Sequence, residues 1–140
     1  MSCASADNCG VGGRYGQKAP HPQAFVVSQV DGTWGEARQV AATLNNGGPA
    51  EITSVSCGSA GNCLAGGYYT DRSGHLQAFA ASEQNGTWRN AIEVPGTGAL
   101  NKGGNAVVAS VSCGSAGHCL VGGSYQDRSG NTQAFVVSQT

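Results

Sequence analysis

The stretch SVSCGSAG at residues 54–61 returns letter for letter at residues 110–117. A third version begins at Ser2, so the cassette S-C-x-S-x-x-x-C occurs three times in a chain of 140 residues. Self-similarity of this kind indicates one supersecondary unit that is used repeatedly. The cassette therefore says more about the architecture than any single residue does.

The repeat has a nearly constant period. The first and second cassettes are 54 residues apart (Ser2 to Ser56), and the second and third are 56 apart (Ser56 to Ser112). The shift of 54 also carries Trp34 onto Trp88. The two additional residues fall in the loop-like stretch PGTGA, where changes of length are tolerated. We therefore treat residues 1–140 as a single repeat domain with units 1–55, 56–111 and a truncated 112–140.

Each unit reads as four short strands, which in the second unit are residues 52–57, 63–69, 77–82 and 91–94. Turn-forming residues separate them. The pairs Asp31-Gly32 and Asn85-Gly86 suit a type I′ hairpin turn, whose two central residues both need positive φ. Helical periodicity is missing from the chain. The sequence thus predicts an all-β fold built from four-stranded antiparallel sheets.

All six cysteines lie in the cassettes as pairs with the same spacing. Five residues separate the two members of a pair, whereas structural zinc sites place cysteines two to four residues apart and need four ligands. We therefore expect local disulfides and no metal site. Disulfides indicate an oxidising compartment, so we expect a secreted protein. The pairs are Cys3/Cys9, Cys57/Cys63 and Cys113/Cys119.

Composition argues against several classes of partner. The formal net charge is −1, only 11% of residues are charged, and the basic residues are scattered, which disfavours nucleic-acid binding. No apolar stretch is long enough to cross a membrane. Met1 is followed at once by the first cassette, with no signal-peptide pattern. We expect a secreted protein whose signal has been removed, or a fragment expressed with a new start Met.

Several repeated features resemble known propeller repeats. A double glycine follows an apolar strand at residues 12–13, 66–67 and 122–123, and Trp34 or Trp88 comes later in the unit, as in kelch-type blades. The pattern G-x-x-Q-A-F-V-V-S-x-x-x-G-T-W is similar to the extracellular HAF repeat of bacterial proteins. Overall the chain most resembles the Cys-paired propeller-like repeats of secreted actinobacterial proteins. The resemblance implies a β-propeller with four-stranded antiparallel blades of about 54–56 residues.

The resemblance has one local departure and one consequence. Residues 16–20 (GQKAP) stand where the later units have TDRSG and QDRSG. Roughly two and a half blades cannot close a ring, because propellers have at least four. Either the chain is a fragment of a longer repeat protein, or several copies form one ring, as in lectins whose subunits have two blades. We expect a homo-oligomer in which residues 133–138 complete a sheet begun by another chain's first cassette.

Trp34 and Trp88 are the first binding candidates. An indole ring stacks on the apolar face of a sugar, and in the fucose-type propeller lectins that these repeats resemble, a Trp near the end of each blade does so. The alternative is that both side chains belong to the core between blades, as in kelch repeats.

Two polar motifs are further candidates. The pairs Asp71-Arg72 and Asp127-Arg128 would bind sugar hydroxyls or a carboxylate, since Arg suits bidentate recognition; the alternative is an Asp-capped turn with a solvated Arg. Asn45 and Asn101 each precede a double glycine and would supply amide contacts to a ligand. The alternative there is a structural turn between blades.

No catalytic pattern is present. The sequence has no G-x-S-x-G motif, and its acidic residues do not align as a repeated pair. We therefore expect neither an enzyme nor a cofactor. Two functions are open: a carbohydrate-binding, lectin-like propeller with repeated shallow sites for a glycan, or a structural or protein–protein interaction propeller in a larger secreted assembly. Exposed Trp34 and Trp88 would favour the first function, and buried ones the second.

Overall fold

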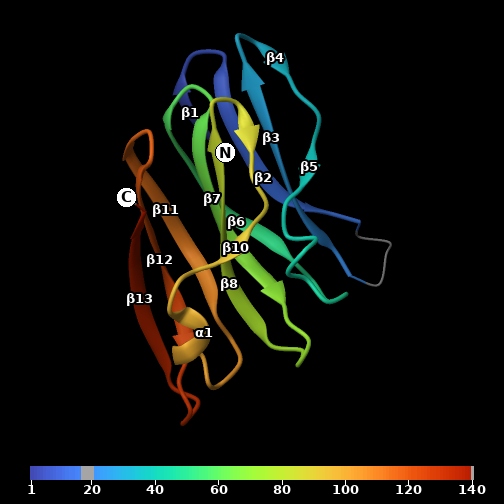
Figure 1. The fold of residues 1–140 in the computed structure, drawn as a ribbon, viewed down its shortest axis with the longest axis vertical. Helices are drawn as coiled ribbons and strands as arrows, with labels where there is room; N and C mark the ends of the chain where they lie inside the picture. Colours follow the sequence, from blue (N-terminus) through green and yellow to red (C-terminus); the bar gives the residue numbers. More distant parts are fainter. Residues whose placement is uncertain (17–20, 140) are drawn as a thin grey trace.

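The computed structural model describes residues 1–16 and 21–139, and it is all-β apart from one short helix (Figure 1). The strands form three antiparallel sheets, and the second and third sheets begin at Glu51 and Val107, before the predicted units 56–111 and 112–140. The first sheet has the order β1-β2-β3-β4, and β5 also pairs with β3. Its strands are β1 (Ser2–Ser5), β2 (Asn8–Tyr15), β3 (Gln23–Val30), β4 (Thr33–Trp34) and β5 (Arg38–Gln39).

The second sheet repeats this arrangement with longer strands. Its order is β10-β8-β7-β6, and β9 pairs with β8. The strands are β6 (Glu51–Ser59), β7 (Asn62–Thr70), β8 (Leu76–Gln84), β9 (Thr87–Trp88) and β10 (Ile92–Glu93). The third sheet has three strands in the order β11-β12-β13, with β11 (Val107–Ser115), β12 (His118–Gln126) and β13 (Thr132–Gln139).

The hairpin turns have the predicted chemistry. Asp31 and Gly32 have φ of 47° and 79°, and Asn85 and Gly86 have φ of 50° and 77°. Both residues of each pair are therefore in the left-handed region that a type I′ turn requires. These turns follow β3 and β8 and begin the short outer strands β4 and β9.

The three sheets lie side by side in chain order, with the second between the other two (Figure 1). Two separate apolar cores hold them together. The first core joins the first two sheets and includes Val26, Ile52, Phe79 and Trp88. The second core joins the last two sheets and includes Leu64, Val108 and Phe135. The predicted all-β, antiparallel fold is confirmed, whereas the described residues form an open series of sheets and not a closed ring.

Two details differ from the prediction. The fourth strand of each complete unit is not continuous: in the second unit it is two strands of two residues each, β9 and β10. The expectation of no helix is wrong at one place, because α1 (Thr97–Leu100) forms where the second unit carries its two additional residues. Four residues are too few to show an amphipathic period, so pattern analysis could not detect this helix.

Candidate functional site

The three cysteine pairs are disulfides, as predicted, and each bridges directly opposed residues of a hairpin. The first serine of the cassette makes a contact between neighbouring sheets. The backbone N–H of Cys57 donates to Ser2 Oγ at 3.1 Å, and that of Cys113 donates to Ser56 Oγ at 3.0 Å. The equivalent Ser112 is exposed and has no such donor among the described residues. The cassette thus joins each sheet to the next one.

The first glycine of each double glycine sets how closely the sheets approach. A Cβ atom added to Gly12 would lie 2.5 Å from Ile52 Cγ2, and one added to Gly66 would lie 2.6 Å from Val108 Cγ1. Any larger residue at these two positions would push the sheets apart. A Cβ at the equivalent Gly122 would meet only a backbone oxygen at 3.9 Å. Gly122 therefore faces open space.

Trp88 is part of the contact between the first two sheets. It is 6% exposed, and its Nε1 donates to Ser28 Oγ at 2.8 Å. The Ser28 hydroxyl donates in turn to Glu83 Oε1 at 2.6 Å. Burial raises the pKa of Glu83, and the hydrogen bond from Ser28 lowers it by less. The second carboxylate oxygen of Glu83 is buried without a hydrogen-bond partner.

Trp34 occupies the equivalent position in the first sheet, but it is 50% exposed. The difference arises because Trp88 packs against the preceding sheet, whereas no sheet among the described residues packs against Trp34. The structure nevertheless places both tryptophans on one pocket of about 290 Å³, together with Ser28 and Glu36.

Asn45 and Asn101 connect consecutive sheets through hydrogen bonds. Asn101 Nδ2 donates to Leu76 O and to Gln77 Oε1, and Asn101 Oδ1 accepts from the backbone N–H of Gln126 in the third sheet. Asn45 makes the equivalent contacts with Gln23 and with the N–H of Thr70. The amide nitrogen and oxygen atoms of both side chains therefore form hydrogen bonds within the chain. This is the arrangement expected of a structural turn, which was the alternative interpretation.

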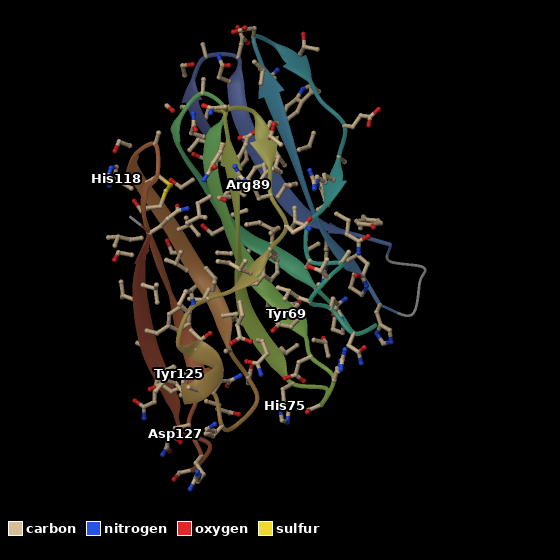
Figure 2. The ribbon with its side chains drawn as sticks, viewed as in Figure 1. Tyr69, His75, Arg89, His118, Tyr125 and Asp127 are labelled. Carbon is tan, nitrogen blue, oxygen red and sulfur yellow. A yellow bond between two sulfur atoms is a disulfide. The ribbon has the colours of Figure 1, made fainter. Side chains whose placement is uncertain are left out.

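Asp71 and Asp127 each close a turn. Oδ1 of Asp71 accepts from the backbone N–H groups of Ser73 and His75, and Oδ2 accepts from Gln77 Nε2 at 2.8 Å. Although burial raises the pKa of Asp71, these hydrogen bonds outweigh it and lower the pKa overall. For Asp127 the hydrogen bond from Gln133 is the main cause of a lowered pKa. Asp127 lies at the same end of the molecule as His75 (Figure 2).

The candidate residues therefore fall into separate groups. Gln77 joins Asp71 to Asn101 in one hydrogen-bonded chain, and the tryptophans share a different pocket. Arg72 and Arg128 are exposed in the turns that follow β7 and β12. The proposed ligand-binding role of the eight residues stays a prediction.

The third sheet exposes apolar side chains whose equivalents in the first two sheets are buried in the contacts between sheets. Leu120 is 53% exposed, whereas its equivalent Leu64 is 3% exposed in the second core. Val136 is 72% exposed, whereas the equivalent Val26 is fully buried in the first core. Because Leu64 and Val26 face the next sheet, Leu120 and Val136 lie on the face that points away from the second sheet. We call this face of β11–β13 the outer face of the third sheet.

An apolar groove lies between the second and third sheets. It has a volume of about 290 Å³, and Arg89 and Ser82 line it near β9. Figure 2 shows Arg89 beside the short strands that follow β8. The apolar lining residues include Leu64, Ala80, Ile92, Val94, Val121 and Val137.

Sequence reasoning missed Ser28, Glu83 and Gln77, which connect the tryptophans, aspartates and asparagines to the neighbouring sheet. A signal was available in the repeat: Gln23, Gln77 and Gln133 occupy one position, and Ser28, Ser82 and Ser138 occupy another. A polar residue that recurs at a fixed place in every unit is typical of a contact between units.

No protein-family model matches this sequence, and the search of curated proteins found no significant match. In the described part of the chain, no helix is long and apolar enough to cross a membrane. Residues 1–16 and 21–139 also contain no cluster of three His, Cys, Asp or Glu side chains placed to hold a metal ion. The three disulfides are compatible with an extracellular location.

Proposed function

We propose that this chain is a structural, protein-interaction module whose end sheets stack on further copies, completing a propeller in an extracellular assembly. The observation that carries the proposal is the contrast between Trp88, which is buried against the preceding sheet, and Trp34, which is half exposed at the equivalent place. Large apolar groups that remain exposed together mark interaction surfaces.

The exposed face of the first sheet and the outer face of the third sheet are complementary, because the chain repeats one way of packing sheets. The chain already makes two contacts of this kind, in which the cassette serine and the first glycine of one sheet face the next sheet. On the outer face of the third sheet, Ser112, Gly122 and Leu120 have the positions that receive the next sheet. On the first sheet, Cys3 N–H and Trp34 have the positions that pack on a preceding sheet. Stacking would pair Trp34 of one copy with Ser138 of another, as Trp88 pairs with Ser28.

This contact is head-to-tail, because two different faces meet. Head-to-tail contacts form a ring when the rotation closes and a filament when it does not. The face-to-face packing of the three sheets supports closure as a propeller, whose blades pack in this way.

Sedimentation equilibrium tests the proposal with the variant Leu120→Arg, which places a charge on the outer face of the third sheet. We expect the wild-type protein to show a mass above that of one chain that rises with concentration, and the variant to stay a single chain. A wild-type protein that remains one chain at all concentrations up to about 100 μM, well above the micromolar range of ordinary associations, would overturn it.

Carbohydrate binding is a second candidate because the pocket that Trp34 and Trp88 share contains aromatic and polar groups. A glycan array with the wild-type protein tests this function. Binding that disappears in Trp34→Ala would support it, and the absence of binding to any sugar would count against it.

A further inference from the structure

The groove between the second and third sheets has an equivalent between the first two sheets, and there it is filled. Trp88 and Ala91 follow β8 and belong to the first core, where they pack against the first sheet. The second core contains Val94 but no counterpart of Trp88 or Ala91 among the described residues. Val26 is fully buried in the first core, whereas the equivalent Ala80 remains partly exposed and lines the groove.

Among residues 21–139, the edge of the third sheet beside the groove carries no additional strand. In the first two sheets the third strand pairs with short outer strands, with Gln29 opposite Trp34 and Glu83 opposite Trp88. In the described part of the third sheet, β13 pairs with β12 alone. An unpaired strand edge offers a row of backbone donors and acceptors to an added strand.

The polar groups at one end of the groove match those that hold Trp88. Ser82 is equivalent to Ser28, and Gln139 is equivalent to Glu83. Ser28 accepts from the Trp88 indole and donates to Glu83. Ser82 and Gln139 both line the groove, and Ser82 Oγ has no hydrogen-bond partner among the described residues.

We propose that the groove and the edge of β13 bind an extended polypeptide segment of a partner by strand addition. The segment carries a Trp, whose indole donates to Ser82 Oγ, and a small apolar residue three positions later that fills the place of Ala91. The Trp lies opposite Gln139, and the residue four positions after it lies opposite Val136, as Ile92 lies opposite Ala80. The groove lies on the side of the third sheet opposite Leu120, which does not line it, although Ser138 of the proposed stacking contact also borders the groove.

A peptide taken from the chain itself is the probe. Residues 85–95, NGTWRNAIEVP, contain the segment that fills the equivalent position in the first contact. A fluorescein-labelled copy should bind the full-length protein saturably in an anisotropy titration. The peptide with Trp88→Ala should bind at least about tenfold more weakly, since a buried Trp is a typical binding hot spot. Ser82→Ala in the protein should weaken binding by about threefold to tenfold, the effect of one lost hydrogen bond.

Two protein variants form a matched pair. Ala80→Arg places a charge in the groove and should abolish binding. Leu120→Arg changes the outer face of the third sheet, away from the groove, and should leave binding unchanged. Circular dichroism establishes that each variant is folded, and Ser82→Ala serves in place of Ala80→Arg if the latter unfolds. The proposal is overturned if the wild-type protein does not bind the peptide, or if it binds the peptide with and without Trp equally well. Neither outcome bears on stacking between copies, which Leu120→Arg tests.

Discussion

Trp88 Nε1 donates a hydrogen bond of 2.8 Å to Ser28 Oγ, which joins the outer strand of the second sheet to the third strand of the first. The ring is buried, and its one polar atom is paired, as a Trp in a core requires. This pair of residues holds the second sheet against the first.

Removing the buried ring should destabilise the fold. We expect Trp88→Ala to lower the free energy of unfolding by about 3–5 kcal/mol, the usual cost of deleting a large buried aromatic side chain. Trp34→Ala, at the equivalent exposed position, should cost less than about 1 kcal/mol in the single-chain state. Urea denaturation at low protein concentration compares the two. Equal losses would show that Trp88 is not a core residue.

Glu83→Gln should stabilise the protein at neutral pH. Gln29 and Gln139 occupy the same position in the other units, and Gln29 Nε2 donates to Gly32 O. A Gln at position 83 would have the equivalent acceptor, Gly86 O, and would remove the unpaired buried oxygen of Glu83. We expect a gain of about 1 kcal/mol at pH 7, within the cost of one unsatisfied buried group.

The gain should depend on pH in a defined direction. Burial raises the pKa of Glu83 above its ordinary value of 4.5, so the folded chain binds more protons than the unfolded chain between the two pKa values. The contribution of Glu83 to stability therefore falls as the pH rises through that interval, and the difference from Glu83→Gln should vanish below about pH 4. Exposed Glu36→Gln is the control. A gain that is the same at pH 3.5 and pH 7 would contradict a titrating Glu83.

Asn101→Ala should be costly because it breaks the connection between the second and third sheets. Asn101 is buried, and its loss leaves Gln77 Oε1 and two backbone N–H groups without their partner. We expect a loss of about 2–3 kcal/mol in thermal or urea unfolding. Asn46→Ala, one residue after Asn45 and exposed, should change stability by less than about 0.5 kcal/mol. A small effect at Asn101 would favour a ligand-binding role over a structural one.

The disulfides should contribute unequally. Each closes a short loop, which is worth about 2 kcal/mol of chain entropy. The Cys57–Cys63 bridge also packs on Gly10 of the first sheet, where an added Cβ would lie 3.0 Å from Cys57 Sγ. Replacing Cys57 and Cys63 by Ala should therefore destabilise the fold more than replacing Cys3 and Cys9, which lie on the first sheet at the end of the series. Equal losses in urea unfolding would show that the bridge adds nothing to the contact between sheets.

Much of the fold could be predicted from the sequence. The period, the hairpin turns and the cysteine pairs are local signals, and local signals fix strands and disulfides. The environment of Trp34 and Trp88 could not be predicted from their shared motif. Both residues follow the same Gly-Thr pair. Trp88 is buried because a preceding sheet packs on it, whereas no sheet among the described residues packs on Trp34.

The polar candidates illustrate the same limit. Asp71 was expected either to bind a ligand or to cap a turn, and its carboxylate accepts hydrogen bonds from its own turn. Asp71 is also connected through Gln77 to Asn101, and these residues lie after β7, in β8 and after α1. No local sequence pattern predicts a connection over that distance. The division of the predicted fourth strand into two short strands could not be predicted either, because its pairing depends on contacts with the neighbouring sheet.

The most direct test of stacking between copies is a mixture of two variants in sedimentation equilibrium. Leu120→Arg blocks the third sheet, and Trp34→Arg blocks the first, so each variant alone should remain a single chain. Because the contact is head-to-tail, the intact first sheet of Leu120→Arg should dock on the intact third sheet of Trp34→Arg. The mixture should therefore give a species of twice the single-chain mass and nothing larger. A mixture that stays at the mass of one chain, while both variants are folded, would contradict the account.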